Sequence, residues 1–216
     1  MFTFRDIFVI ILVDLKNYRG GKMNNKIIAI VGMCGSGKSV ASDMLVDMGY
    51  EKVYFGGVTL DKMREEGIDI TPDNEKKMRE RLRSEYGMGA YALLLLPKIK
   101  ELVRKSNVVL DGLYSWDELK ILQDELGSNL KVVAIIVDKN IRYSRLAKRE
   151  IRGLTSEQAM KRDIAEIENL AKGGPIVYAD YYIDNNFDID SYKKRLLEIL
   201  DKIDKEKEAD LNEKND

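Results

Sequence analysis

The chain of 216 residues contains no histidine, one cysteine and three prolines. The absence of histidine excludes Ser-His-Asp and Cys-His catalysis and the usual histidine-containing zinc sites. A single cysteine excludes an internal disulfide and is typical of the reducing cytosol, so we expect a cytoplasmic protein. The 36 Lys and Arg residues balance the 37 Asp and Glu residues, so the basic excess typical of proteins that coat nucleic acids is missing. The chemistry must therefore rely on lysine, arginine, carboxylates, hydroxyls, backbone amides or a hard metal ion.

The N-terminus lacks a hydrophobic run long enough to cross a bilayer. Its apolar run, residues 7–13, is far shorter than the roughly 20 residues that a spanning helix needs, and Asp6 and Asp14 bracket it. We therefore expect neither a membrane span nor a signal peptide. Met23 directly precedes the first regular pattern, so residues 1–22 are interpreted as an extension upstream of a natural start, or as an arm that docks on the domain or on a partner chain.

Residues 23–204 show no internal repeat and no linker-like stretch, which predicts one domain. The remaining residues, 205–216, are densely charged and predict a flexible tail. Within the domain, short apolar runs alternate with amphipathic helical patterns, which indicates βαβ units and a parallel sheet covered on both faces. The expected strands are residues 26–31, 51–55, 107–111, 131–137 and 181–184.

Residues 32–39 read GMCGSGKS and match G-x-x-x-x-G-K-[ST] at every fixed position, between an apolar strand and a helix. Glycines let such a loop turn its amide groups inward, and the following helix presents its positive end to the same anion. We therefore expect Lys38 to contact the β- and γ-phosphates of ATP and Ser39 to bind Mg²⁺. The alternative is a chance glycine-rich turn. The residues expected to bind the nucleotide are Gly32, Met33, Cys34, Gly35, Ser36, Gly37, Lys38, Ser39 and Val40.

Two further features fit this chemistry. Asp111 ends the apolar run NVVLD. An acid at the end of a buried strand is the Walker-B arrangement, which holds Mg²⁺ directly or through water; the alternative is an ordinary Asp-Gly turn. A helix expected over residues 140–151 carries a basic stripe, whose arginines would share one arc of about 80° and neutralise phosphoryl charge, although a solvated basic face is the simpler alternative. The stripe consists of Arg142, Arg145, Arg149 and Arg152.

The glycine-rich loop, together with VVLDG, RYSRLAKR and ADYYIDN, resembles the P-loop small-molecule and nucleotide kinases, and most of all an archaeal group of dephospho-CoA-kinase-like or adenylate-kinase-like proteins. The resemblance implies a three-layer α/β/α fold with a mostly parallel five-stranded sheet. It implies a helical substrate-binding insert at about 56–105 and a mobile lid at about 142–160. Lid arginines would be the catalytic partners of Lys38, and the family pattern matches Arg142, Arg145 and Arg149.

On the acceptor side, the resemblance assigns Arg83 to the acceptor's phosphate and points to an Arg162-Asp163 pair near the lid. The chain also departs from the family pattern, because Gly57 and Leu60 stand where adenylate-kinase-type proteins carry an aspartate and an arginine. We expect that Arg64, Arg81 or Arg83 compensates. Tyrosines near the last strand either pack or stack on adenine, namely Tyr178, Tyr181 and Tyr182.

The leading hypothesis is a Mg-ATP-dependent phosphotransferase acting on a nucleotide, of the nucleoside monophosphate type, or on another small acceptor. The alternatives are a nucleotide-dependent regulatory ATPase without a small-molecule acceptor, a dephospho-CoA kinase, and a catalytically inactive relative.

Overall fold

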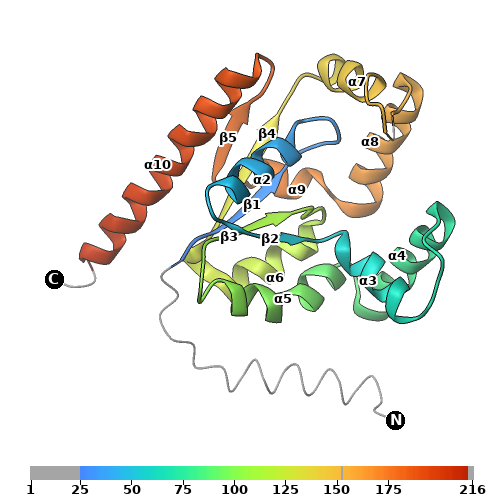
Figure 1. Cartoon of the computed structure of the whole chain (residues 1–216), viewed down its shortest axis with the longest axis horizontal. Helices are drawn as coiled ribbons and strands as arrows, with labels where there is room; N and C mark the ends of the chain where they lie inside the picture. The colour runs from blue at the N-terminus through green and yellow to red at the C-terminus, as the bar shows by residue number, and fades with distance from the viewer. Residues whose placement is uncertain (1–24, 152, 214–216) are drawn as a thin grey trace, which may run out of the picture.

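The computed structural model describes residues 25–151 and 153–213, and its five strands form one parallel sheet in the order β2-β3-β1-β4-β5 (Figure 1). All four neighbouring pairs are parallel, which confirms the α/β prediction. The chain leaves the central strand β1 where the strand order reverses, the place where open α/β sheets bind ligands at their carboxyl ends. The strands are β1 (Ile27–Val31), β2 (Glu51–Tyr54), β3 (Val108–Asp111), β4 (Leu130–Ile136) and β5 (Tyr181–Asp184).

Helices cover both faces of the sheet, as the three-layer prediction requires (Figure 1). Strand β1 is buried throughout, and its alternate side chains enter two separate apolar cores. Ile28 and Ile30 pack in the core formed with α2 (Lys38–Asp47) and α10 (Ile189–Glu213). On the other face lie α5 (Ala90–Leu102), α6 (Trp116–Leu126), the 3₁₀ turn η1 (Gly127–Asn129) and α9 (Gly173–Val177).

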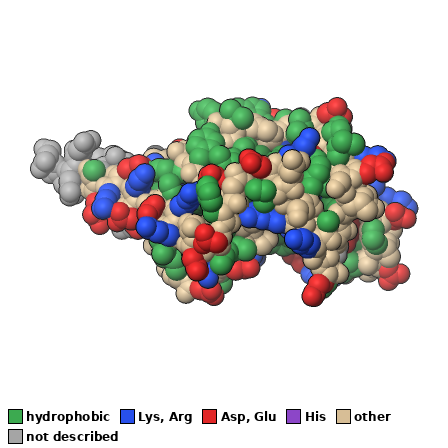
Figure 2. Space-filling view, turned by 90° about the horizontal axis from the view of Figure 1, so that it is seen from above, with side chains coloured by type: hydrophobic (Ala, Val, Ile, Leu, Met, Phe, Trp, Pro, Cys, Tyr) green, Lys and Arg blue, Asp and Glu red, His purple; other side chains and the backbone are tan. Residues whose placement is uncertain are grey.

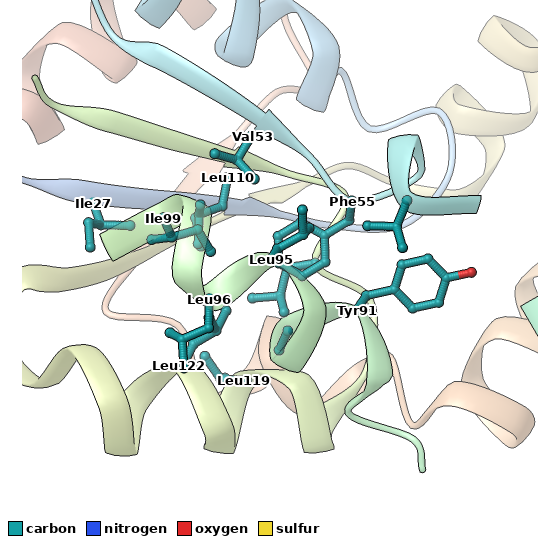
Figure 3. Packing of buried hydrophobic residues seen from close by; sticks show 14 of the residues in the cluster. Ile27, Val53, Phe55, Tyr91, Leu95, Leu96, Ile99, Leu110, Leu119 and Leu122 are labelled. Carbon is teal, nitrogen blue, oxygen red and sulfur yellow. The ribbon is translucent and has the colours of Figure 1, made fainter. Parts of the chain in front are cut away.

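Helix α5 belongs to the layer that covers the sheet. Figure 3 shows Leu95 and Ile99 of α5 between the sheet residue Leu110 and α6. Pro97 lies inside α5, which continues past it. Only α3 (Gly57–Glu65) and α4 (Pro72–Tyr86) therefore project from the layers within the expected insert of 56–105.

The segment expected to form the lid contains α7 (Lys139–Ala147) and α8 (Ser156–Leu170), which lie beside the carboxyl end of the sheet (Figure 1). The expected helix over 140–151 ends early, at Ala147, and the Leu154 amide then donates to the Leu146 carbonyl at 3.1 Å. Arg149 consequently lies beyond the helix that carries Arg142 and Arg145, so the predicted arc is not formed as expected. The fourth stripe residue, Arg152, lies outside the described residues.

The last helix extends further than the sequence pattern indicates. Helix α10 continues to Glu213, past the predicted boundary at 204, and Glu206 on it lies 3.3 Å from Lys131 of β4. The predicted extension 1–22 lies outside the described residues. Across 25–151 and 153–213, no helix combines the length and apolar character needed to span a membrane. Figure 2 shows acidic and basic side chains intermingled on one face, in line with the near-zero net charge.

Candidate functional site

Three side chains from other segments donate hydrogen bonds to carbonyl groups of the glycine-rich loop (residues 32–39). Arg142 of α7 donates to the Cys34 carbonyl at 2.9 Å, the Asn185 amide donates to the Ser36 carbonyl at 2.8 Å, and the Tyr192 hydroxyl donates to the Gly37 carbonyl at 3.0 Å. The Ser36 amide donates to the Met33 carbonyl at 3.2 Å within the loop. With three carbonyls bound by side chains, other amides of the loop are left to face a ligand, as in an anion-binding nest.

Glycine is required in this loop for space as well as for conformation. Gly37 has φ +96°, and a Cβ there would lie 2.5 Å from the Asn185 amide nitrogen. A Cβ on Gly32 would lie 2.5 Å from the carbonyl oxygen of Ile135 in β4. The loop therefore packs tightly against β4 and the segment after β5, which fixes its curvature.

Lys38 begins α2 and folds back over the loop. Its ammonium donates to the carbonyls of Gly32 at 2.7 Å and Met33 at 2.9 Å. Burial, together with the nearby positive charge of Lys172, lowers the pKa of Lys38 to about 7. No carboxylate forms an ion pair with Lys38 among the residues that the structure describes. Ser39 and Val40 are exposed at the N-terminal end of α2, where the helix dipole favours an anion.

Asp111 lies at the carboxyl end of β3, paired in register with Ile30 of β1 just before the loop. One of its carboxylate oxygens lies 3.0 Å from the ammonium of Lys52, which also contacts Asp43 at 3.1 Å. This lysine on the neighbouring strand was not predicted as a partner. Within the described ranges, no group of three or more Asp, Glu or Cys residues is placed to hold a metal ion by itself.

Arg142 is buried and makes a two-pronged ion pair with Asp163 of α8, with distances of 3.1 and 2.6 Å. The Tyr143 hydroxyl also donates to Asp163 at 3.2 Å. Asp163 therefore pairs with Arg142, whereas its neighbour Arg162 pairs with Glu166. Together with the bond to the Cys34 carbonyl, these contacts tie α7, α8 and the glycine-rich loop into one unit.

The other two predicted lid arginines are differently placed. One nitrogen of Arg145, Nη1, is buried and lacks a hydrogen-bond partner within the described part of the chain. The positive charge of Arg145 opposes the rise that burial causes in the pKa of Tyr192. Because the Tyr192 hydroxyl binds the Gly37 carbonyl, Arg145 lies near the loop. Arg149 is exposed beyond the end of α7.

The three arginines predicted to bind the acceptor do not share an environment. Arg64 pairs with Asp61 at 2.8 Å on the surface of α3, and Arg81 binds the carboxylate of Glu66, also at the surface. Arg83 instead lies over the Tyr91 ring at 5.4 Å, and its buried Nε has no hydrogen-bond partner among the described residues. Of these three arginines, Arg83 is therefore the one whose buried N–H group is still able to donate a hydrogen bond.

A second cation beside the loop was missed by sequence reasoning. Lys172 is 2% exposed and forms an ion pair with Glu166 at 2.5 Å, and Glu166 also accepts from Arg162 at 3.0 Å. Burial lowers the pKa of Lys172, although Glu166 opposes this. Burial raises the pKa of Glu166, but Lys172 and Arg162 outweigh it and hold that pKa below its usual range. A lone lysine after a polar helix carries no sequence signal that marks it as buried.

The tyrosines near β5 make contacts within the fold. Tyr178 meets the Trp116 ring edge-on, with ring centroids 5.3 Å apart, and the Tyr182 hydroxyl donates to the Val177 carbonyl. Burial raises the pKa of Tyr181, and a hydrogen bond to Glu206 of α10 adds to this. These contacts correspond to the packing alternative for the three residues.

A parallel sheet with this loop after its central strand defines a P-loop protein with a kinase-like fold. The profile of the AAA domain family matches residues 28–163, so the chain belongs to that family of P-loop domains. It also belongs to the UPF0200 family. The UPF0200 protein of Thermococcus onnurineus is 33% identical over 82% of this chain and 97% of its own length. The UPF0200 protein of Sulfurisphaera tokodaii is 34% identical over 82% of this chain and 97% of its own length.

Solved structures with the same fold include kinases. Shikimate kinase from Acinetobacter baumannii, in complex with shikimate, aligns with a TM-score of 0.55 and 18% identity over 88% of this chain and 96% of that one. A gluconokinase from Sinorhizobium meliloti aligns with a TM-score of 0.52 and 15% identity over 85% of this chain and 95% of that one. At these identities the likeness establishes the fold alone.

Proposed function

We propose that this chain is a phosphotransferase that moves the γ-phosphoryl group of Mg-ATP to a small-molecule acceptor. The observation that carries the proposal is the state of the glycine-rich loop. Three of the loop's carbonyls accept hydrogen bonds from Arg142, Asn185 and Tyr192. Lys38, at the end of the loop, has no carboxylate partner within the described residues. A loop that presents amides next to a lysine without a carboxylate partner suits a polyphosphate.

The residues around the loop fit a bound Mg-nucleotide. Ser39 and the carboxylate oxygen of Asp111 that is not paired with Lys52 would hold Mg²⁺, together with phosphate oxygens and water. When bound, the ion neutralises charge on the β- and γ-phosphates. Lys38 would bind the same phosphates, and Arg145, with its unpartnered Nη1, would approach them from α7. Phosphoryl transfer depends mainly on positioning and charge stabilisation, so the lack of histidine is no obstacle.

The acceptor would bind between the sheet edge and helices α3 and α4. Arg83 is the residue that we assign to an anionic group of the acceptor, because its Nε is buried and free to donate. Arg64 and Arg81 are engaged in surface ion pairs and contribute less. Candidate acceptors are nucleoside monophosphates, as the resemblance to adenylate-kinase-like proteins suggests, dephospho-CoA, and small hydroxy acids.

A regulatory ATPase without a small acceptor is the second candidate. It is favoured by the surface ion pairs of Arg64 and Arg81, together with Leu60 at the position where an acceptor arginine is expected. That protein would bind ATP and hydrolyse it slowly, at a rate that no small acceptor changes.

The test is ADP release from Mg-ATP across a panel of nucleoside monophosphates, dephospho-CoA and hydroxy acids. We expect at least one acceptor to raise the rate well above hydrolysis. The Lys38→Met variant should abolish that rate, and the Lys161→Met variant, which changes an exposed lysine of α8, should keep it. ATP binding with no acceptor-dependent release would favour the regulatory ATPase. Activity that survives Lys38→Met would contradict both candidates.

A further inference from the structure

Lys52 bridges two carboxylates on the face of the sheet that α2 covers. Its ammonium lies 3.0 Å from a carboxylate oxygen of Asp111 on β3 and 3.1 Å from a carboxylate oxygen of Asp43 on α2. Both are hydrogen-bond distances between an ammonium and a carboxylate. The Asp111 side chain is 13% exposed, that of Lys52 is 30% exposed and that of Asp43 is 68% exposed. The lysine therefore links an inner acid at the end of a strand to an outer acid on a helix.

The two acids lie at different distances from the glycine-rich loop. Asp43 follows Ser39, the other residue assigned to Mg²⁺, by one helical turn, so both project from one side of α2. At about 1.5 Å per residue, Asp43 lies about 6 Å further along the helix from the loop. On β2, Lys52 pairs in register with Val109, two residues before Asp111. The backbone of Lys52 and the side chain of Asp43 are thus both set back from the carboxyl end of the sheet, where the phosphates would bind.

Lys52 would have to share Asp111 with a bound metal ion. Asp111 carries one negative charge, and its other carboxylate oxygen is the one assigned to Mg²⁺. Two cations on one carboxylate repel each other, so the ammonium and the metal weaken each other's binding. The Lys52 ammonium already contacts Asp43 as well. Lys52 can therefore leave Asp111 by losing one contact and still keep a counter-ion.

We propose that Lys52 is a positioning residue for Asp111 and that Asp43 receives the Lys52 ammonium when Asp111 binds Mg²⁺. Before the metal binds, Lys52 neutralises Asp111 and so reduces its repulsion of the nucleotide's phosphates. Once Asp111 binds the metal, Lys52 stays paired with Asp43, further from the loop. Asp43 thus acts on metal binding through Lys52 and is not itself a Mg²⁺ ligand. The inference rests on the proposed binding of Mg-ATP, and it adds the pair that sets how much Mg²⁺ the site needs.

The test is calorimetric titration of the full chain with ATP at a series of free Mg²⁺ concentrations, which gives the Mg²⁺ midpoint for ATP binding. Asp43→Asn leaves Lys52 with Asp111 alone, so the midpoint should rise about two- to fivefold, as expected for one partly exposed ion pair. In a Lys52→Met background, Asp43→Asn should change the midpoint much less, because no ammonium remains for Asp43 to receive. Lys52→Arg should retain the dependence on Asp43. The matched control is Asp47→Asn, which changes an exposed acid one turn further along α2 and should leave the midpoint unchanged.

A rise of the same size with and without Lys52 would overturn the inference, because Asp43 would then act by its own charge or as a metal ligand. An unchanged midpoint for Asp43→Asn alone would also overturn it, and so would ATP binding that is independent of Mg²⁺. In these cases ATP still binds, so nucleotide binding stands. Wild-type protein that binds no ATP at any Mg²⁺ concentration would instead overturn the proposed function. If Lys52→Met does not fold, Lys52→Gln provides the uncharged background with the same expectations.

Discussion

Replacing Arg142 with methionine tests how the fold holds its glycine-rich loop. The substitution removes three hydrogen bonds, two to Asp163 and one to the Cys34 carbonyl. Arg142 and Asp163 are 6% and 7% exposed, so Asp163 would stay buried as an unpaired carboxylate. Breaking a buried ion pair on one side costs about 3–5 kcal/mol. The Tyr143 hydroxyl still donates to Asp163, so we expect the lower end, about 3 kcal/mol.

The free energy of unfolding is measured by urea denaturation and checked by thermal melting. For a chain of this length, a loss of about 3 kcal/mol lowers Tm by about 6–12 °C. The double variant Arg142→Met/Asp163→Leu should recover most of this loss, because an apolar pair replaces a buried ion pair at little cost. As a control, Arg81→Met changes an exposed arginine that also pairs with a carboxylate, and it should leave stability nearly unchanged.

Nucleotide affinity provides a second readout. Arg142→Met frees the Cys34 carbonyl, so ATP binding should weaken in protein that is still folded, and the double variant should not restore it. The account would be refuted if Arg142→Met and Arg81→Met had the same small effect on stability. It would also be refuted if the double variant were as unstable as Arg142→Met alone.

Three further substitutions have defined expectations. Gly37→Ala places a Cβ 2.5 Å from the Asn185 amide nitrogen, so calorimetry should show ATP affinity reduced at least tenfold, and wild-type affinity would contradict the loop geometry. Lys52→Met frees Asp111 of its lysine, so ATP binding should require less Mg²⁺; an unchanged Mg²⁺ midpoint would argue against Asp111 as a ligand. Ala171→Gly relieves a left-handed backbone and should stabilise the protein by about 0.5–1 kcal/mol in urea denaturation, whereas destabilisation would show that the turn is unstrained.

The sheet and the loop were predictable because their signals are local. The run KIIAIV is apolar at consecutive positions, and β1 is buried along its whole length. The loop was found from fixed spacing between a strand and a helix. Local signals also begin two helices, because Ser115 and Thr155 each form a capping box with the residue three positions later.

The arginines were less predictable, because the sequence does not show which carboxylate each one meets. Arg81 pairs with Glu66, fifteen residues away, and Arg142 pairs with Asp163 on another helix. The arc through Arg149 assumed a continuous helix, but α7 ends at Ala147, where Leu154 closes the turn onto Leu146. Periodicity alone does not show where a helix stops.

The residues that complete the site come from distant segments. Asn185 and Tyr192 bind loop carbonyls across about 150 residues of sequence, with separations of 149 and 155. Lys172 joins the site only in the folded chain, where it is buried close enough to Lys38 for its charge to lower the Lys38 pKa. Neither periodicity nor motif spacing reports such contacts, because they depend on how β5, α9 and α10 pack around the loop.

The central claim is that the glycine-rich loop binds a nucleoside triphosphate, and calorimetric titration of the folded chain with Mg-ATP tests it most directly. We predict one saturable site that Lys38→Met removes and Lys161→Met leaves intact. Folded wild-type protein that shows no saturable heat of binding, or a Lys38→Met variant that binds as tightly as wild type, would contradict the claim.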